Sequence, residues 1–340
     1  MLIGLLPTYQ QIGVAAPILL LLLRIAQGIG LGGEWGGAVL MAYEYAPRDQ
    51  RGFYASLPQI GLAIGLCLSS GVVAIMSSLP EEQFLSWGWR VGFLLSFVLV
   101  AVGLYIRLKI LETPEFQQVK ERGEEAKLPF VEMARNYPRN ILLGMGARYI
   151  DGVFFNIFAV FSGQHGEISA HGGPVDGVDL GPGDDLHHPD LRTSQRSLGR
   201  PKTYAIGSFL LALSAYPAFW LLSSGSTPAI ALGLIVPFGI IYAMCYGPEA
   251  ALFADLFDAR VRYTGISFVY QFSGIFASGL TPIIATWLLV QNGNQPWLIC
   301  AYVVFAALVS MVCAMAIGRD RHMAERTAMP AETAKPIAPV

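Results

Sequence analysis

The feature that most constrains this chain of 340 residues is a succession of long apolar stretches. A helix needs about 20 predominantly apolar residues to cross a bilayer. Eight stretches reach that length: 17–45, 53–79, 91–110, 141–161, 204–222, 228–253, 264–290 and 297–317. Only 14% of the residues are charged, whereas about 25% are charged in soluble domains. We therefore expect an all-α polytopic membrane protein, because a helix satisfies its backbone polar groups internally.

Charge and motifs argue against several other classes of protein. A net charge of −2 gives no basic surface for nucleic acid. The spans contain no nucleophile–base pair and no metal-ligand constellation, so we predict no enzyme, no metal site and no cofactor. A metal-binding loop is an alternative for residues 162–198, which hold four of the five histidines, but their spacing fits no defined site.

Lys and Arg in the short loops predict how the spans are oriented, because cytoplasmic loops carry the excess of basic residues. Arg48 and Arg51 follow the first span, the loop at 77–88 has no basic residue, and 107–139 has seven. The last spans alternate in the same way, and the tail at 319–340 is basic. We expect this tail to be cytoplasmic, which requires an odd number of further crossings before residue 204.

The chain also resembles itself at a shift of 211 positions. This shift aligns Glu44 with Asp255 and Arg51 with Arg262, and each pair lies where one span ends and the next begins. One large class of secondary transporters is built from parallel repeats of a six-helix unit. The repeat therefore predicts two similar bundles that rock about a central site.

Several blocks of sequence resemble the major facilitator superfamily. The block RIAQGIGLGGEWGG, which begins at Arg24, is similar to the fourth helix of its metabolite:proton symporter family, near the shikimate-type permeases. Further matches are WGWR from Trp87, ETPEF from Glu112, YGP from Tyr246 and RVRYTG from Arg260. The resemblance implies a twelve-helix fold, of which eight spans are recognisable here, and an N-terminally truncated chain that begins near the end of the third helix.

The resemblance also implies a domain organisation. Residues 1–110 would be the remainder of the N-terminal bundle, 111–140 the cytoplasmic loop between the bundles, 141–318 the C-terminal bundle and 319–340 the cytoplasmic tail. Residues 162–198 match nothing in the family. Codons can be chosen for residues 181–198 so that a shifted reading frame encodes the end of an apolar helix. That helix end is followed by the Gly-x-x-x-Asp-Arg-x-Gly-Arg loop motif, which the resemblance implies at this place. We interpret 162–198 as a frameshifted eighth helix, so an inactive remnant of a transporter is an alternative function.

Ionisable side chains inside spans are candidates for proton coupling, because each costs about 2.5–3.5 kcal/mol on insertion scales. Arg24 and Glu34 are ten residues apart and would lie near one face of a single helix. The resemblance associates the motif of Arg24 with proton coupling, and a snorkelling side chain is the alternative. Glu34, which we expect to be buried among glycines, is either a proton carrier or a structural carboxylate. Asp151 is the third candidate.

A second polar group lies in the span at 141–161. The guanidinium of Arg148 could pair bidentately with a substrate carboxylate, or it could bridge structurally to Asp151. Further candidates for contacts with a polar substrate are Tyr149, Asn156, Gln59, Tyr270 and Gln271. For Gln59, Tyr270 and Gln271, packing in the core is the alternative role.

Two more features predict how the helices pack and move. Gly28, Gly32 and Gly36 recur at every fourth residue, as do Gly33 and Gly37, a pattern typical of close helix packing in lipid. The resemblance further implies a conformational latch at the cytoplasmic helix ends, formed by Glu44, Arg51, Asp255 and Arg262.

Together these features predict a secondary active transporter in the inner membrane of the cell. It would carry a small organic acid or polar metabolite with protons by alternating access, driven by the proton gradient. An osmolyte symporter of the same family, which would carry a zwitterion, is a second alternative.

Overall fold

The computed structural model describes residues 1–47, 50–109, 113–123, 126–171 and 199–319. These residues form helices, and they contain no strand. Eight helical segments among them are long and apolar enough to cross a membrane, in the order that the sequence predicts. The predicted fold class, an all-α polytopic membrane protein, is confirmed.

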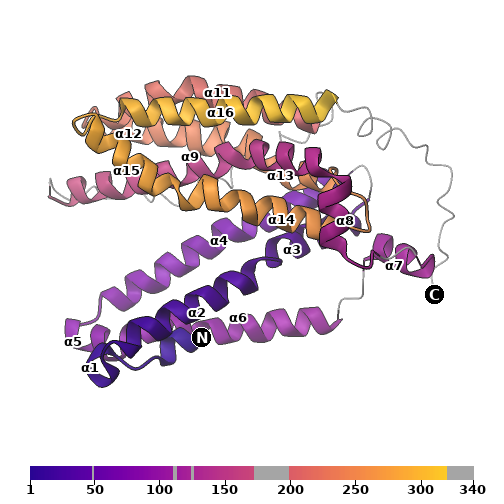
Figure 1. Cartoon of the computed structure of the whole chain (residues 1–340). Helices are drawn as coiled ribbons and strands as arrows, with labels where there is room; N and C mark the ends of the chain where they lie inside the picture. Colours follow the sequence, from indigo (N-terminus) through magenta and orange to yellow (C-terminus); the bar gives the residue numbers. More distant parts are fainter. Residues whose placement is uncertain (48–49, 110–112, 124–125, 172–198, 320–340) are drawn as a thin grey trace.

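Two groups of helices make up the molecule, and two short helices connect them (Figure 1). The first group consists of α1 (Tyr9–Ile12), α2 (Ala15–Leu31), α3 (Glu34–Glu44), α4 (Arg51–Ser77), α5 (Glu81–Gln83) and α6 (Trp89–Lys109). The connecting helices are α7 (Pro114–Glu121) and α8 (Pro129–Asn136). The second group consists of α9 (Pro138–His171), α11 (Arg200–Leu222), α12 (Thr227–Leu234), α13 (Ala243–Ala254), α14 (Arg262–Gly274), α15 (Thr281–Gln291) and α16 (Trp297–Arg319).

Three of the predicted spans are interrupted rather than continuous. The first breaks between α2 and α3 at Gly32 and Gly33, where two residues without side chains weaken the helix. A π-helical turn at Ile235–Ile241 separates α12 from α13, and Pro237 accepts a hydrogen bond of 2.9 Å from the Tyr242 N–H five residues on. A second π-helical turn, Ile275–Gly279, joins α14 to α15. Such π-helical turns are a common cause of kinks in helices.

The predicted polar segment 162–198 lies largely outside the described residues. Its first part, up to His171, continues α9 beyond the predicted end of that span at Phe161. The proposed frameshift, the histidine-rich loop and the tail at 320–340 lie outside the part of the chain whose side chains the structure describes.

The two groups of helices meet at one end and diverge toward the other (Figure 1). They are joined where α3 and α4 pack against α13 and α14, next to α8. At the opposite end, α5 and α12 lie far apart. The fold therefore forms a V that is closed at the end of α8 and open at the end of α5.

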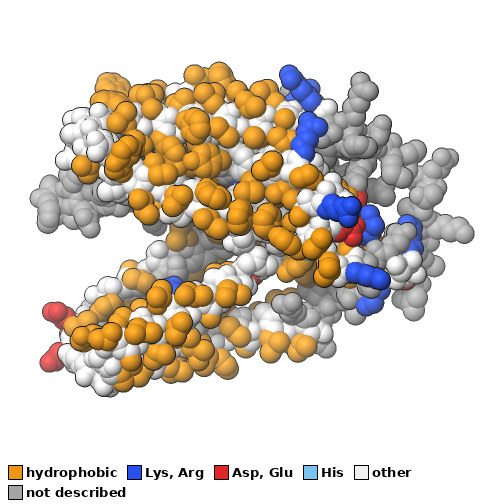
Figure 2. Space-filling model, viewed as in Figure 1, with side chains coloured by type: hydrophobic (Ala, Val, Ile, Leu, Met, Phe, Trp, Pro, Cys, Tyr) orange, Lys and Arg blue, Asp and Glu red, His pale blue; other side chains and the backbone are white. Residues whose placement is uncertain are grey.

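Packing differs between the two groups. The main core lies in the second group, where large side chains such as Phe154, Tyr204 and Phe219 are fully buried. A smaller core, rich in alanine, joins the groups at the closed end, and it consists of Val39, Tyr43, Ala55, Ala250, Ala251, Ala254 and Ile266. Small side chains let the helix backbones approach closely. The outer faces of both groups are covered by apolar side chains, which would face lipid (Figure 2).

Basic side chains gather at the closed end of the V. Figure 2 shows Lys and Arg over the ends of the helices near α8, whereas acidic side chains are visible near α5 at the open end. This distribution follows the loop charges in the sequence and gives the molecule one basic face.

Glycines hold α3 close to α14. A Cβ atom on Gly36 would lie 2.3 Å from Ser267 Oγ, and one on Gly33 would lie 2.3 Å from the Tyr263 hydroxyl. The predicted close packing therefore occurs at Gly33 and Gly36. At Gly28, by contrast, a Cβ atom would meet nothing within 4 Å.

The substitution Gly36→Leu should destabilise the closed end, because overpacking costs about 1–3 kcal/mol. We expect the midpoint of thermal unfolding of the detergent-solubilised protein to fall by several degrees, whereas Gly28→Leu, the matched control, should leave it unchanged. Equal midpoints for the two variants would show that α3 does not pack against α14 in this way.

Candidate functional site

A buried polar cluster lies where the two groups of helices meet. The central cluster, as we define it, consists of Trp35, Gln59, Arg148, Asp151, Tyr242, Glu249 and Tyr270. Trp35 comes from α3 and Gln59 from α4, in the first group of helices, and the other residues come from the second group. A site shared by both groups changes shape whenever they move relative to each other.

Aromatic rings link the two sides of the central cluster. Trp35 stacks on Tyr270 with ring centroids 3.6 Å apart, and the guanidinium carbon of Arg148 lies 3.7 Å from the centroid of the Tyr270 ring. The indole N–H of Trp35 donates a hydrogen bond of 3.0 Å to Gln59, and the Gln59 amide contacts the Tyr246 carbonyl at 3.5 Å. The stacked rings thus fix the orientation of the Arg148 side chain.

Arg148 is the only basic residue in the central cluster, and it faces two carboxylates. Its Nη2 lies 3.5 Å from Asp151, and its Nε lies 3.8 Å from Glu249. Arg148 is 6% exposed, Asp151 4% and Glu249 0%. Asp151 also accepts a hydrogen bond from the Tyr242 hydroxyl. In the described part of the chain, Arg148 Nε and Nη1 have no hydrogen-bond acceptor, so the N–H groups on these two nitrogens are available to a ligand.

The other residues predicted from α9 lie near this cluster without joining it. The Tyr149 hydroxyl lies 3.0 Å from that of Tyr302, which lies 3.1 Å from Thr281 Oγ1. Asn156 donates a hydrogen bond of 2.7 Å to the carbonyl of Gly152 in its own helix. Tyr149 thus forms a separate polar group with Tyr302 and Thr281, and Asn156 makes a hydrogen bond only within its own helix.

The structure does not bring Arg24 and Glu34 into the central cluster. Both side chains are exposed, and the break at Gly32 and Gly33 removes the shared helix face on which we based their pairing. Arg24 donates a hydrogen bond to Gln27 at 3.2 Å and lies 6.0 Å from the Phe93 ring centroid. The predicted burial of Glu34 is wrong, because its side chain is exposed, and no described residue pairs with it.

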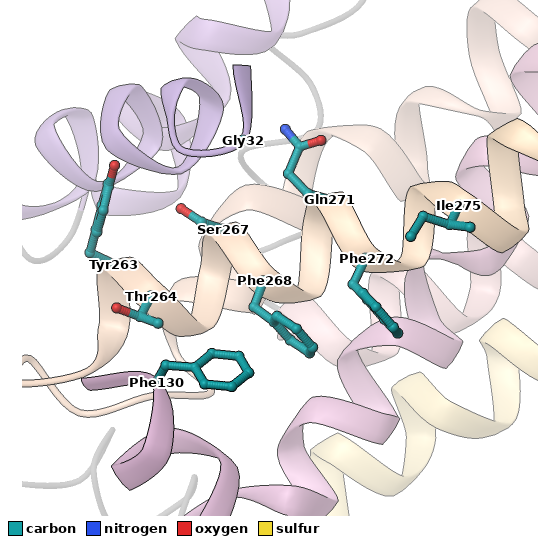
Figure 3. Close-up of a pocket in the computed structure, with 9 residues that line it drawn as sticks. All are labelled: Gly32, Phe130, Tyr263, Thr264, Ser267, Phe268, Gln271, Phe272 and Ile275. Carbon is teal, nitrogen blue, oxygen red and sulfur yellow. The ribbon is translucent and has the colours of Figure 1, made fainter. Parts of the chain in front are cut away.

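Gln271 lies in a separate, shallow groove of about 400 Å³ along α14 (Figure 3). Its amide donates a hydrogen bond of 3.1 Å to the carbonyl of Leu31. Figure 3 shows Ser267 and Gln271 pointing toward Gly32, whereas the aromatic side chains of Phe268 and Phe272 point the other way. The walls are mostly apolar, so this groove offers few groups that could recognise a polar solute.

Charged side chains form a second network at the closed end. The closed-end network, as we define it, consists of Tyr43, Glu44, Arg51, Glu115, Arg200, Asp255 and Arg262. Arg262 lies 2.7 Å from Glu44 and 2.5 Å from Glu115, which also lies 2.5 Å from Arg51. Arg200 pairs with Asp255. The network crosses between the two groups of helices through the Glu44–Arg262 pair and through a hydrogen bond from Tyr43 to Asp255.

Tyr43 lies at the centre of the closed-end network. Its hydroxyl donates a hydrogen bond of 2.6 Å to Asp255. The guanidinium carbons of Arg51, Arg262 and Arg200 lie 4.8, 5.7 and 5.9 Å from its ring centroid. The aromatic face therefore supplements the carboxylates as a partner for three cations. All four residues predicted for a latch lie in this network.

Glu115 should make the closed end sensitive to acid. Burial raises the pKa of its carboxyl group, but Arg262 and Arg51 outweigh burial, so the pKa lies below the ordinary value. Ionised Glu115 stabilises the network above the ordinary carboxyl pKa, and this contribution is lost as the pH falls through the lowered pKa. We expect the unfolding midpoint of the wild type to fall on acidification more steeply than that of Glu115→Gln. The variant Glu121→Gln, exposed on the same helix, should keep the wild-type profile, and identical profiles for all three would contradict this role.

Sequence reasoning missed Trp35, Tyr242 and Glu249 in the central cluster, and Tyr43, Glu115 and Arg200 in the closed-end network. Glu249 is an ionisable residue inside a predicted span, so the rule that selected Arg148 could also have found it. Trp35 and Glu115 lie in blocks that resemble the major facilitator superfamily, but the resemblance assigns them no role. Nothing in the sequence distinguishes Tyr43 from the other tyrosines.

Comparisons with known proteins agree with this architecture. Residues 2–136 match the family model described as "Sugar (and other) transporter". The chain is 36% identical to the "Inner membrane metabolite transport protein YhjE" of Escherichia coli, covering 86% of this chain and 68% of the relative. It is 34% identical to the "Shikimate transporter" of the same organism, covering 92% and 73%, and 30% identical to its "Proline/betaine transporter", covering 97% and 68%. No solved structure matches the chain.

The fold and the relatives define a class of protein, a polytopic helical transporter rather than an enzyme. Within that class, the chain belongs to the major facilitator superfamily, among its metabolite transporters.

Proposed function

We propose that the protein is a proton-coupled symporter of a small organic acid or polar metabolite. The observation that carries the proposal is the position of Arg148, which is buried where the two groups of helices meet and has unused hydrogen-bond donors. A guanidinium in this position is suited to a planar carboxylate, which it can bind through two parallel hydrogen bonds.

The names of the relatives support an anionic or zwitterionic solute. Shikimate, proline and betaine each carry one carboxylate, which is the group that Arg148 would bind. An organic acid needs only this contact, together with hydrogen bonds from neighbours such as Gln59. Because betaine is also a quaternary ammonium compound, the aromatic pair Trp35 and Tyr270 favours an osmolyte as the second candidate.

Alternating access would follow from the V shape of the molecule. The basic residues at the closed end support a cytoplasmic location for this end by the positive-inside rule, so the open end would face outward. The tail after α16 would then also be cytoplasmic. Solute would enter between the diverging helices, and the closed-end network would open to release it. The name of the relative YhjE supports a location in the inner membrane.

Transport in proteoliposomes tests this proposal. We expect labelled shikimate, or alternatively labelled proline or betaine, to accumulate above its external concentration when the lumen is made alkaline. A protonophore should abolish that accumulation. Accumulation that is the same with and without the proton gradient would contradict proton coupling. If the protein transports none of these solutes, the result would favour the alternative that it is an inactive remnant of a transporter.

A further inference from the structure

Glu249 is a buried carboxylate of the central cluster, and binding of a solute carboxylate by Arg148 does not by itself require it. It lies on α13, it is fully buried, and neither of its oxygens accepts a hydrogen bond from the described residues. The nearest basic group is Arg148 Nε at 3.8 Å. A carboxylate ion in such surroundings loses its hydration without gaining donors in return, which is costly.

Among the described groups that surround Glu249 there is one cation, Arg148, and Glu249 shares it with Asp151. Asp151 lies closer to Arg148, at 3.5 Å, and also accepts a hydrogen bond from Tyr242. The titratable and charged groups that face Glu249 from the surrounding helices are Arg148, Asp151, Tyr204, Tyr242, Cys245 and Tyr270. Phenols and thiols are ordinarily neutral at pH 7. One guanidinium therefore faces two carboxyl groups, and the cluster is neutral only when one of them holds a proton.

We propose that Glu249 is the proton-binding site of the transporter and that its proton controls whether Arg148 can bind a solute carboxylate. The inference rests on the proposed function and deepens it. With Glu249 protonated, Arg148 pairs only with Asp151, and its free N–H groups can donate to the solute. When the solute leaves, the O–H bond of Glu249 breaks, the proton passes to water on the cytoplasmic side, and the ionised carboxylate takes up Arg148.

The variant Glu249→Gln tests the coupling, because glutamine has the shape of the protonated acid but releases no proton. We expect exchange of internal for external solute to continue, whereas accumulation driven by an alkaline lumen should fall from several-fold to the external concentration. Glu249→Asp should retain part of the accumulation. The control Glu82→Gln removes an exposed carboxylate at the open end and should accumulate solute as the wild type does. Wild-type accumulation by Glu249→Gln would overturn the proposal.

Infrared spectroscopy tests the protonation of Glu249 without any transport. Purified wild type should show the C=O stretching band of a buried protonated carboxyl group at pH 7, which disappears at alkaline pH. Glu249→Gln should lack this band, and Glu249→Asp should shift it. Absence of the band from the wild type would overturn the inference even if no variant folds. If the band is present but wild-type uptake ignores the proton gradient, the proposed function fails instead.

Discussion

Replacing Arg148 by lysine should raise the solute concentration needed for half-maximal uptake about 10- to 100-fold. Lysine keeps the positive charge beside Asp151 and Glu249, so the buried carboxyl groups are not left without a cation. It loses the planar pair of donors and the stacking on Tyr270. The hydrogen bonds of a charged group are worth about 1.5–3 kcal/mol, and about 1.4 kcal/mol corresponds to a factor of ten.

The measurement is the initial rate of uptake over a range of solute concentrations in proteoliposomes. The control is Arg122→Lys, which alters an exposed residue just after α7 and should not change the kinetics. An Arg148→Lys protein that folds and transports with wild-type kinetics would exclude a direct contact between the guanidinium and the solute.

Replacing Arg262 by glutamine should shift the protein toward a form that is open to the cytoplasm. In the closed form, Arg262 pairs with Glu44 and Glu115, and the Glu44 side chain is 2% exposed. Without Arg262 this carboxylate is buried without a cation in the closed form, whereas water can solvate it in the open form. Removing one partner of a buried charge pair costs about 2 kcal/mol at the low end. Destabilising the closed form by this free energy shifts the equilibrium between the closed and the open form about 30-fold toward the open form.

Electron paramagnetic resonance measures that shift as a distance distribution. Spin labels would be attached through Tyr54→Cys on α4 and Ala259→Cys after α13, with the four native cysteines replaced. We expect Arg262→Gln to populate longer distances than the parent protein. The matched control is Arg260→Gln, because the Arg260 side chain is 41% exposed and its distance to Glu132 is 3.5 Å. An unchanged distribution in Arg262→Gln would show that the ion pairs of Arg262 do not hold the two groups of helices together.

The spans were predictable from the sequence because their signal is local. Within the described residues, apolar length and low charge identify every helix that is long and apolar enough to cross the membrane, and the observed segments follow the predicted ranges closely. The interruptions within spans were not predicted. Gly32 and Gly33 were interpreted as packing residues, whereas in the structure they also end one helix before the next begins.

The central cluster was predictable only in part. Ionisable residues are rare inside spans, and this criterion selects Arg148 and Asp151 on α9. Gln59 and Tyr270, which were predicted as contacts for a polar substrate, also lie in the cluster. Their proximity depends on how α4 and α14 pack against α9 and α13, which no local pattern encodes. Arg24 and Glu34 satisfied the same rule of rarity, yet the side chains of both are exposed, because composition does not reveal which way a helix turns.

The closed-end network shows the same limit for paired charges. The internal repeat selects Glu44 and Arg51 in one half and Asp255 and Arg262 in the other. In the structure Glu44 pairs with Arg262 of the other half, and Arg51 pairs with Glu115 of α7. A repeat identifies equivalent positions, but the partners depend on how the two halves meet.

The most direct test of proton-coupled transport through the central cluster is to record solute and proton flow in the same vesicles. An entrapped pH-sensitive dye would report the lumen while labelled solute is added without an imposed gradient. We expect solute entry to acidify the lumen in the wild type, and we expect Arg148→Lys to reduce both flows together. Solute entry by the wild type with no change in luminal pH would contradict the account.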